Sequence, residues 1–238
     1  MTLNNNLHFK IASLNVAGIK GWTDRLPKIV DVLNSQELDI LCLQEVRFDV
    51  CEGVSQADQL NRLLHTPSRY VSADIVKRYE TSTGEIYREG LAIMSRLPII
   101  TTETIVLDKA PDDKHHRYVQ FIDLEKADES IMIAHVHFSN NQHSVSQLKE
   151  VLSILEKRGE ERIIIGDFNI LDIGDIRREA TDYKISYDHT AYVSFPREGI
   201  TLDYALLPDS FRLMNVTTSE GLSDHAMVCF EVGEEDRV

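Results

Sequence analysis

Cysteine, proline and glycine are scarce in this chain, which narrows the classes of protein to which it can belong. Three cysteines cannot form a paired disulfide framework. Cys42 and Cys229 lie in apolar, strand-like runs, where a thiol behaves as a small hydrophobic group, and nothing beside Cys51 indicates a nucleophile. The 6 prolines and 11 glycines are not gathered into a linker, so we expect residues 1–238 to form a single domain.

Long hydrophobic runs are also lacking. Ser13 and Asn15 interrupt the apolar stretch within the first twenty residues, which matches neither a signal peptide nor a membrane span of roughly 18 apolar residues. We therefore expect no membrane span and a cytoplasmic location. No segment of the sequence indicates a protein partner.

Positively charged residues are also few: the chain has 25 Lys and Arg residues against 39 Asp and Glu residues, which gives a net charge of −14. This balance argues against non-specific attraction to a polyanion. The negative net charge does not exclude a polyanionic substrate, since bound divalent cations would neutralise some of the carboxylates. The two basic clusters, Lys114-His115-His116-Arg117 and Arg177-Arg178, are each more typical of a solvated loop than of a binding surface.

Apolar periodicity predicts many strands and few helices. Helices are expected over 24–35, 55–65 and 144–157, the last with a Ser144-x-x-Gln147 capping box. Strands are expected over 8–15, 38–44, 70–77, 87–94, 103–107, 117–124, 130–137, 161–166, 189–194, 201–207, 211–217 and 225–232. This content favours an α/β fold in which two sheets pack face to face with helices outside.

Polar residues stand where these strands end. Asn15, Glu45, His137, Asp167 and Asn169 follow apolar runs, whereas Asp203 and the pair Asp224-His225 lie at or near the amino ends of theirs. In a partly antiparallel sheet the two sets meet along one edge. Clustered carboxylates with few cations among them predict a bound metal, and the absence of zinc-type Cys/His spacing favours Mg²⁺ or Mn²⁺.

Seven short motifs occur in order along the chain. They are Ser13-Leu14-Asn15-Val16, Leu43-Gln44-Glu45-Val46, Gly90-Leu91-Ala92-Ile93-Met94-Ser95-Arg96, Val136-His137-Phe138, Gly166-Asp167-Phe168-Asn169, Leu202-Asp203-Tyr204 and Ser223-Asp224-His225. Together they resemble the endonuclease/exonuclease/phosphatase superfamily, which includes deoxyribonuclease I, over residues 13–225. The resemblance implies a four-layer α/β/β/α sandwich, with two mixed, mainly antiparallel sheets, and Mg²⁺-dependent hydrolysis of phosphoesters.

The resemblance also implies roles for the residues of these motifs. Glu45 is similar to the principal metal ligand, with Asn15 and Asp224 as supporting ligands. Asp167 resembles the carboxylate that positions the attacking water, and Asn169 the amide that donates to the phosphate. His225 resembles a histidine held by a buried Asp203, although Asp203 on its own could simply cap a strand.

His137 must be distinguished from His135, because strand alternation puts both on one face. The resemblance places His137 at the phosphate and leaves His135 as a supporting or core histidine. Glu89 resembles the carboxylate that supports this catalytic histidine, although a solvated glutamate is equally compatible with the sequence. Arg117 is a reasonable contact for the substrate phosphate.

Departures from the family pattern narrow the branch. Apurinic-site endonucleases carry an acidic residue where this chain has Ala17, so that activity is disfavoured. The leading function is a metal-dependent phosphodiesterase of the histidine-containing branch, acting on nucleic acid or a nucleotide-like diester by in-line attack of water. A phospholipid or inositol-phosphate phosphoesterase is the alternative. A non-catalytic binding protein on the same fold is a remote one.

Overall fold

A computed structural model describes residues 7–49, 53–80, 86–109, 116–127, 129–140 and 142–235. Cys51, Lys114 and His115 lie outside these ranges. The helices are α1 (Trp22–Ser35), α2 (Gln56–Leu63), α3 (Ser144–Arg158), α4 (Ile173–Glu179) and α5 (Ser186–His189). Within the described ranges, no helix is both long and apolar enough to cross a membrane.

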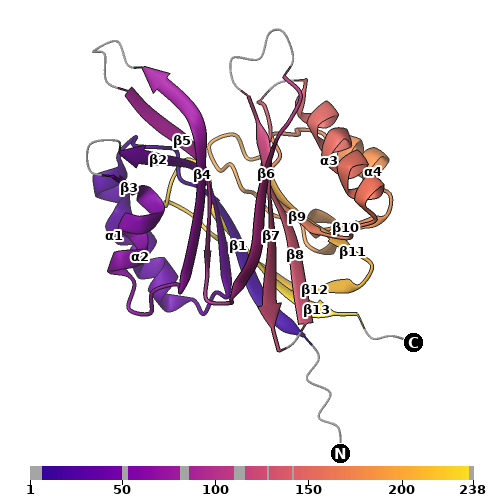
Figure 1. Cartoon of the computed structure of the whole chain (residues 1–238), viewed down its shortest axis with the longest axis horizontal. Coiled ribbons are helices and arrows are strands. Elements are labelled where there is room, and N and C mark those ends of the chain that lie inside the picture. The colour runs from indigo at the N-terminus through magenta and orange to yellow at the C-terminus, as the bar shows by residue number, and fades with distance from the viewer. Residues whose placement is uncertain are drawn as a thin grey trace, which may run out of the picture.

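Two sheets stand face to face between the helices (Figure 1). The first has the order β12-β13-β1-β2-β5-β4, with β3 paired to β2, and the second has the order β10-β11-β9-β8-β7-β6. The strands of the first sheet are β1 (His8–Asn15), β2 (Ile40–Asp49), β3 (Val54–Ser55), β4 (Tyr70–Glu80), β5 (Ile86–Ser95), β12 (Phe211–Ser219) and β13 (Met227–Glu234). Those of the second are β6 (Ile99–Val106), β7 (Tyr118–Lys126), β8 (Glu129–His137), β9 (Ile163–Asp167), β10 (Tyr183–Ile185) and β11 (Asp203–Pro208).

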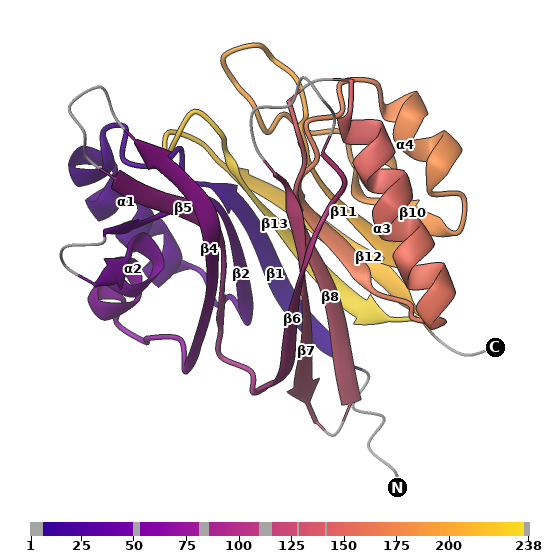
Figure 2. The same ribbon diagram turned by 45° about the horizontal axis from the view of Figure 1, so that its top comes forward.

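Three hydrophobic clusters separate the four layers. The first, which includes Ile11, Ile133 and Phe230, lies between the two sheets. The second packs α1 and α2 on the outer face of the first sheet, and the third packs α3 and α4 on the outer face of the second. Figure 2 shows the helix pairs on opposite sides of the paired sheets. The expected four-layer α/β/β/α sandwich is confirmed.

Each sheet contains one parallel pair at its centre. β1 and β2 pair in parallel through the crossover that contains α1, and β8 and β9 do so through α3. The neighbours of these pairs are antiparallel. The carboxyl ends of the parallel strands therefore lie beside the amino ends of β11 and β13, which is the arrangement that the polar strand ends predicted.

Three local predictions differ from the structure. Residues 189–194 form no strand, because α5 ends at His189 and a loop with an isolated bridge between Phe195 and Ile200 follows. The short elements β3, α4, β10 and α5 were not predicted. The predicted capping box of α3, with Ser144 as the N-cap, is wrong. His143 is the N-cap and its side chain makes no capping hydrogen bond, while the Gln147 side chain accepts from the backbone N–H of Ser139.

Candidate active site

The parallel pair β1 and β2 presents an amide and a carboxylate at its carboxyl edge. Asn15 is the last residue of β1 and pairs with Gln44 of β2, directly before Glu45. Glu45 has φ of 54°, in the left-handed region, where the pairing of β2 with β5 shifts register between Leu43 and Val46. Such a bulge re-aims a side chain, and a non-glycine residue held in this conformation is a frequent feature of functional sites.

The parallel pair β8 and β9 brings His137 opposite Asp167. Glycine is required just before Asp167: Gly166 has φ of 144°, and a Cβ there would lie 2.0 Å from the carbonyl oxygen of Val136. The absence of a side chain therefore allows β8 and β9 to approach closely at the site.

The tight turn after β9 is held by Asn169, whose φ is 51°. Its backbone N–H donates to Asp167 Oδ1 at 3.1 Å, and its side-chain Nδ2 donates to the carbonyl of Phe138 at 3.0 Å. Asparagine tolerates the left-handed conformation better than most residues do. The turn thus fixes Oδ1 of Asp167, while Oδ2 faces the other residues of the site.

Asn15 links the two sheets at this edge. Its Nδ2 donates to Asp167 Oδ2 at 3.0 Å and to Glu45 Oε1 at 3.3 Å, while its Oδ1 accepts from the backbone N–H of Ala17 at 2.9 Å. In this orientation Asn15 holds the two carboxylates with its amide hydrogens. Its Oδ1 keeps a second lone pair beside the bond from Ala17, so it can also support a metal ligand set.

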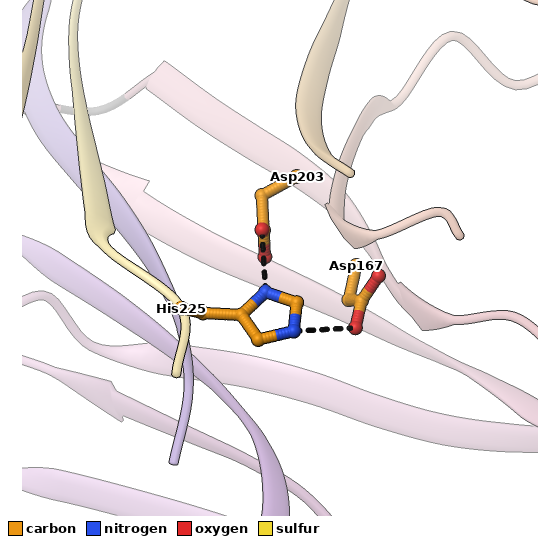
Figure 3. Close-up of side chains that lie close together, drawn as sticks. All are labelled: Asp167, Asp203 and His225. Atoms are coloured by element: carbon orange, nitrogen blue, oxygen red, sulfur yellow. Dashed lines mark hydrogen bonds and ion pairs between the residues drawn. The ribbon is translucent and has the colours of Figure 1, made fainter. Parts of the chain in front are cut away.

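Two histidines complete the group around Asp167. His137 Nε2 lies 3.5 Å from Asp167 Oδ2, and His225 Nε2 lies 3.8 Å from the same oxygen. On its other side, His225 Nδ1 is 2.8 Å from Asp203 Oδ2 (Figure 3). The predicted pairing of His225 with Asp203 is present, and it fixes the orientation of the imidazole ring.

Burial and neighbouring charges shift the pKa values of this group. Burial alone would lower the pKa of His225, but the charge and hydrogen bond of Asp203 outweigh it and raise this pKa to about 9. The pKa of Asp167 is also raised, first by burial and then by the charge of Asp203, with partial compensation from His225 and Asn15. At neutral pH, His225 therefore carries a positive charge between two buried carboxyl groups.

The loop between α5 and β11 positions the His225–Asp203 pair. Ser194 Oγ accepts from the backbone N–H of Asp203 at 3.0 Å, and the Ser194 carbonyl accepts from the N–H of Ala226 at 2.8 Å. The hydroxyl of Tyr192 donates to the Asp203 carbonyl at 2.9 Å. The Phe195 ring packs against the His225 ring with centroids 5.0 Å apart. Sequence reasoning missed Tyr192 and Ser194 because it assigned residues 189–194 to a strand.

Arg117 and Glu89 lie beside this centre, in a pocket that His137 also lines. The Nε of Arg117 is buried and has no hydrogen-bond partner within the described ranges. The carboxylate of Glu89 lies against Gly18, in the loop that follows β1. The pocket is lined by Glu45, Glu89, Gly90, Leu91, His116, Arg117, Tyr118 and His137.

The donor set fits a hard divalent cation. Asp167, Asp203 and His225 have ligand atoms within 4.8 Å of one another, and Asp203 Oδ1 is buried without a partner in the described part of the chain. Asp203 Oδ2 is bonded to His225, and both oxygens of Asp167 accept hydrogen bonds, from Asn169 and Asn15. Glu45 accepts from Asn15 through Oε1. Oxygen-rich sites of this type suit Mg²⁺ or Mn²⁺ better than zinc.

His135 lies outside the site. It is fully buried between the sheets, with Nε2 at 2.7 Å from Gln44 Nε2 and Nδ1 at 3.4 Å from Gln120 Oε1. Burial lowers the pKa of His135 to about 3, so its ring is neutral near pH 7. Of the two histidines on this strand, only His137 contacts Asp167 within the described ranges.

The sequence matches the model of the endonuclease/exonuclease/phosphatase family over residues 12–225. This chain belongs to that family. As an endonuclease/exonuclease/phosphatase family member it is a hydrolase of a group whose members are generally phosphoesterases. The resemblance carried by the seven motifs is thereby confirmed.

Solved structures of this family share the fold. The endonuclease/exonuclease/phosphatase from Beutenbergia cavernae DSM 12333 is 17% identical, with a TM-score of 0.76 over 95% of this chain and 72% of that one. The human nocturnin catalytic domain is 16% identical, with a TM-score of 0.69 over 99% and 96%. Sphingomyelinase C from Streptomyces griseocarneus is 17% identical, with a TM-score of 0.67 over 96% and 100%. No curated protein sequence matches this chain.

Proposed function

We propose that this protein is a Mg²⁺- or Mn²⁺-dependent phosphodiesterase that acts on nucleic acid or a nucleotide-like diester. One observation carries the proposal: Asp167 Oδ2 is the common neighbour of Asn15, His137 and His225, at 3.0, 3.5 and 3.8 Å respectively. A carboxylate surrounded by hydrogen-bond donors from both sheets is suited to orient a water molecule beside a phosphate.

The reaction needs an oriented nucleophile and donors for the charge that develops on phosphate oxygens. Asp167 orients the water for in-line attack. His137 and His225, whose Nε2 atoms lie 3.5 and 3.8 Å from Asp167 Oδ2, donate hydrogen bonds to the phosphate oxygens. Asn169 adds a further amide donor at the same turn. Asp203 keeps the His225 ring in place through Nδ1.

Glu45 and Asp224 would hold the metal ion, with Asn15 as a supporting residue. When bound, the ion neutralises charge on the phosphate and polarises its oxygens. Without it, the site gathers carboxyl groups whose charges repel one another, as the influence of Asp203 and Glu45 on the pKa of Asp167 indicates.

Arg117 would contact the phosphate from the pocket that contains Glu45 and His137. Its buried Nε has no acceptor among the described residues, which supports this role because a buried guanidinium N–H without an acceptor is costly unless a ligand supplies one. Glu89 would support His137 from the same pocket.

A phospholipid diester is the second candidate, and one observation favours it. Leu171 is 75% exposed two residues after Asn169, and Ile19 is 55% exposed in the loop after Asn15. Apolar side chains on loops next to the site could contact the acyl part of a lipid. The small number of such residues leaves the nucleotide-like substrate as our first choice.

The decisive experiment is a hydrolysis assay on a panel of DNA, RNA, phospholipids and inositol phosphates with Mg²⁺ and with Mn²⁺. Asp167→Asn should lower the rate on the preferred substrate by ~10²-fold or more. Asp172→Asn is the matched control, because Asp172 caps α4 nearby and asparagine caps equally well. Equal rates for wild type and Asp167→Asn would reveal a contaminating enzyme and contradict the proposal.

A further inference from the structure

Arg25 connects two loops that flank the proposed metal site. Its Nε donates to the carbonyl of Lys20 at 2.9 Å and its Nη2 to that of Gly18 at 3.3 Å, both in the loop after Asn15. Its Nη1 donates to the carbonyl of Leu222 at 3.1 Å, two residues before Asp224. One guanidinium therefore joins segments that lie about two hundred residues apart in the sequence.

The guanidinium is itself held in place. Arg25 belongs to the first turn of α1, and its Cζ lies 5.8 Å from the centre of the Trp22 ring. The Trp22 indole N–H donates to Gln59 of α2 at 2.9 Å. Arg25 is half-buried, so its orientation is set by the packing of both helices as well as by its hydrogen bonds.

The charge of Arg25 lies close to two proposed metal ligands without being paired to them. Burial lowers the pKa of Arg25, and the charges of Asp224 and Glu45 raise it in partial compensation. Arginine remains protonated in proteins under such shifts. Its described hydrogen bonds go to carbonyl groups, so the carboxylates of Asp224 and Glu45 stay available to a cation.

We infer that Arg25 is a positioning residue that raises the affinity of the site for its divalent cation by fixing the loop after Asn15 against the loop before Asp224. This inference rests on the proposed metal-dependent function. Two effects of Arg25 oppose each other, because its charge repels a cation while its hydrogen bonds preorganise the ligands. The planar guanidinium, which binds three carbonyls at once, makes preorganisation the larger effect.

The test measures Mn²⁺ binding by calorimetry for wild type, Arg25→Lys and Arg25→Met. Lysine keeps the charge but cannot span three carbonyls, and methionine removes both. We expect each substitution to weaken Mn²⁺ binding by about 10- to 100-fold. The control is Arg158→Met, because Arg158 also lies over an aromatic ring, with its Cζ 5.1 Å from the centre of Phe121, and pairs with Glu103 on the other sheet. It should bind Mn²⁺ as wild type does.

The outcomes separate the mechanisms. Unchanged binding in Arg25→Lys, or tighter binding in Arg25→Met, would show that only charge matters and would overturn the inference. If Arg25→Met does not fold, as judged by its melting temperature in EDTA, Arg25→Lys decides alone. Wild type that binds no Mn²⁺ would overturn the proposed metal dependence together with this inference, whereas wild-type binding unaffected by Arg25→Lys overturns the inference alone.

Discussion

Acid should destabilise this protein through His135, which lies in the core rather than in the site. Because burial lowers the pKa of His135 to about 3 from an ordinary value of 6.5, the folded protein leaves this ring neutral at pH values where the unfolded chain protonates it. The stabilisation associated with the neutral ring is fully present above pH 6.5 and is lost as the pH falls towards 3.

The magnitude follows from the two pKa values. At pH 4 the unfolded chain binds one proton at this position and the folded protein binds almost none, which reduces the free energy of unfolding by about 3 kcal/mol relative to pH 8. His135→Gln removes the titrating group while retaining an amide that can bond to Gln44 and Gln120. Between pH 8 and pH 4, the free energy of unfolding of this variant should therefore fall by about 3 kcal/mol less than that of wild type.

Urea unfolding at pH 8, 6, 5 and 4 in EDTA measures this difference, with the fluorescence of the one tryptophan, Trp22, as the signal. EDTA removes the effect of metal binding on stability. The other titrating groups are common to both proteins and cancel in the comparison. Parallel pH dependences for wild type and His135→Gln would refute a neutral, buried His135.

Three further predictions concern the site. Mg²⁺ or Mn²⁺ above its dissociation constant should raise the melting temperature of wild type, and Glu45→Gln should abolish most of this shift in a thermal denaturation assay; a wild-type melting temperature indifferent to both metals would count against the site. His137→Ala and His225→Ala should each lower phosphodiesterase activity by ~10²-fold or more while His135→Gln changes it little, and the reverse pattern would contradict the assignment of His137. Rates per scissile bond should show little dependence on substrate length or on salt, because Arg177 is paired with Asp188, and Arg178 with Asp175 and Glu179, rather than available to bind additional phosphates. A large gain in rate with length that salt removes would indicate an extended nucleic-acid groove.

The sequence predicts the strands well where burial alone determines the pattern of apolar residues. Buried strands such as β9 and β8 show runs of apolar residues, and each ends in a polar residue that water or a ligand must satisfy. The order of the motifs, from Asn15 to His225, specifies the family and hence the four layers. The fold class and the residue types that line this edge of the sheets therefore follow from the sequence.

Local patterns fail where side chains, rather than periodicity, decide the backbone. Residues 189–194 resemble a strand, but Ser194 binds the backbone of Asp203 and Tyr192 binds Ser186, so this segment is a loop tied to the site. Ser144 and Gln147 have the spacing of a capping box, yet Gln147 turns back to Ser139. In both cases the competing partner lies outside the segment, where a local pattern carries no information.

The sequence by itself determined the family, the layer order and the chemical types of the site residues, because these depend on hydrophobic periodicity and on short motifs. Only the tertiary structure decided which atoms meet. It showed that one oxygen of Asp167 serves Asn15, His137 and His225. It also separated His135 from His137 and placed Arg25 between two distant loops. Such contacts join residues far apart in the chain, and their distances are set by how the two sheets pack.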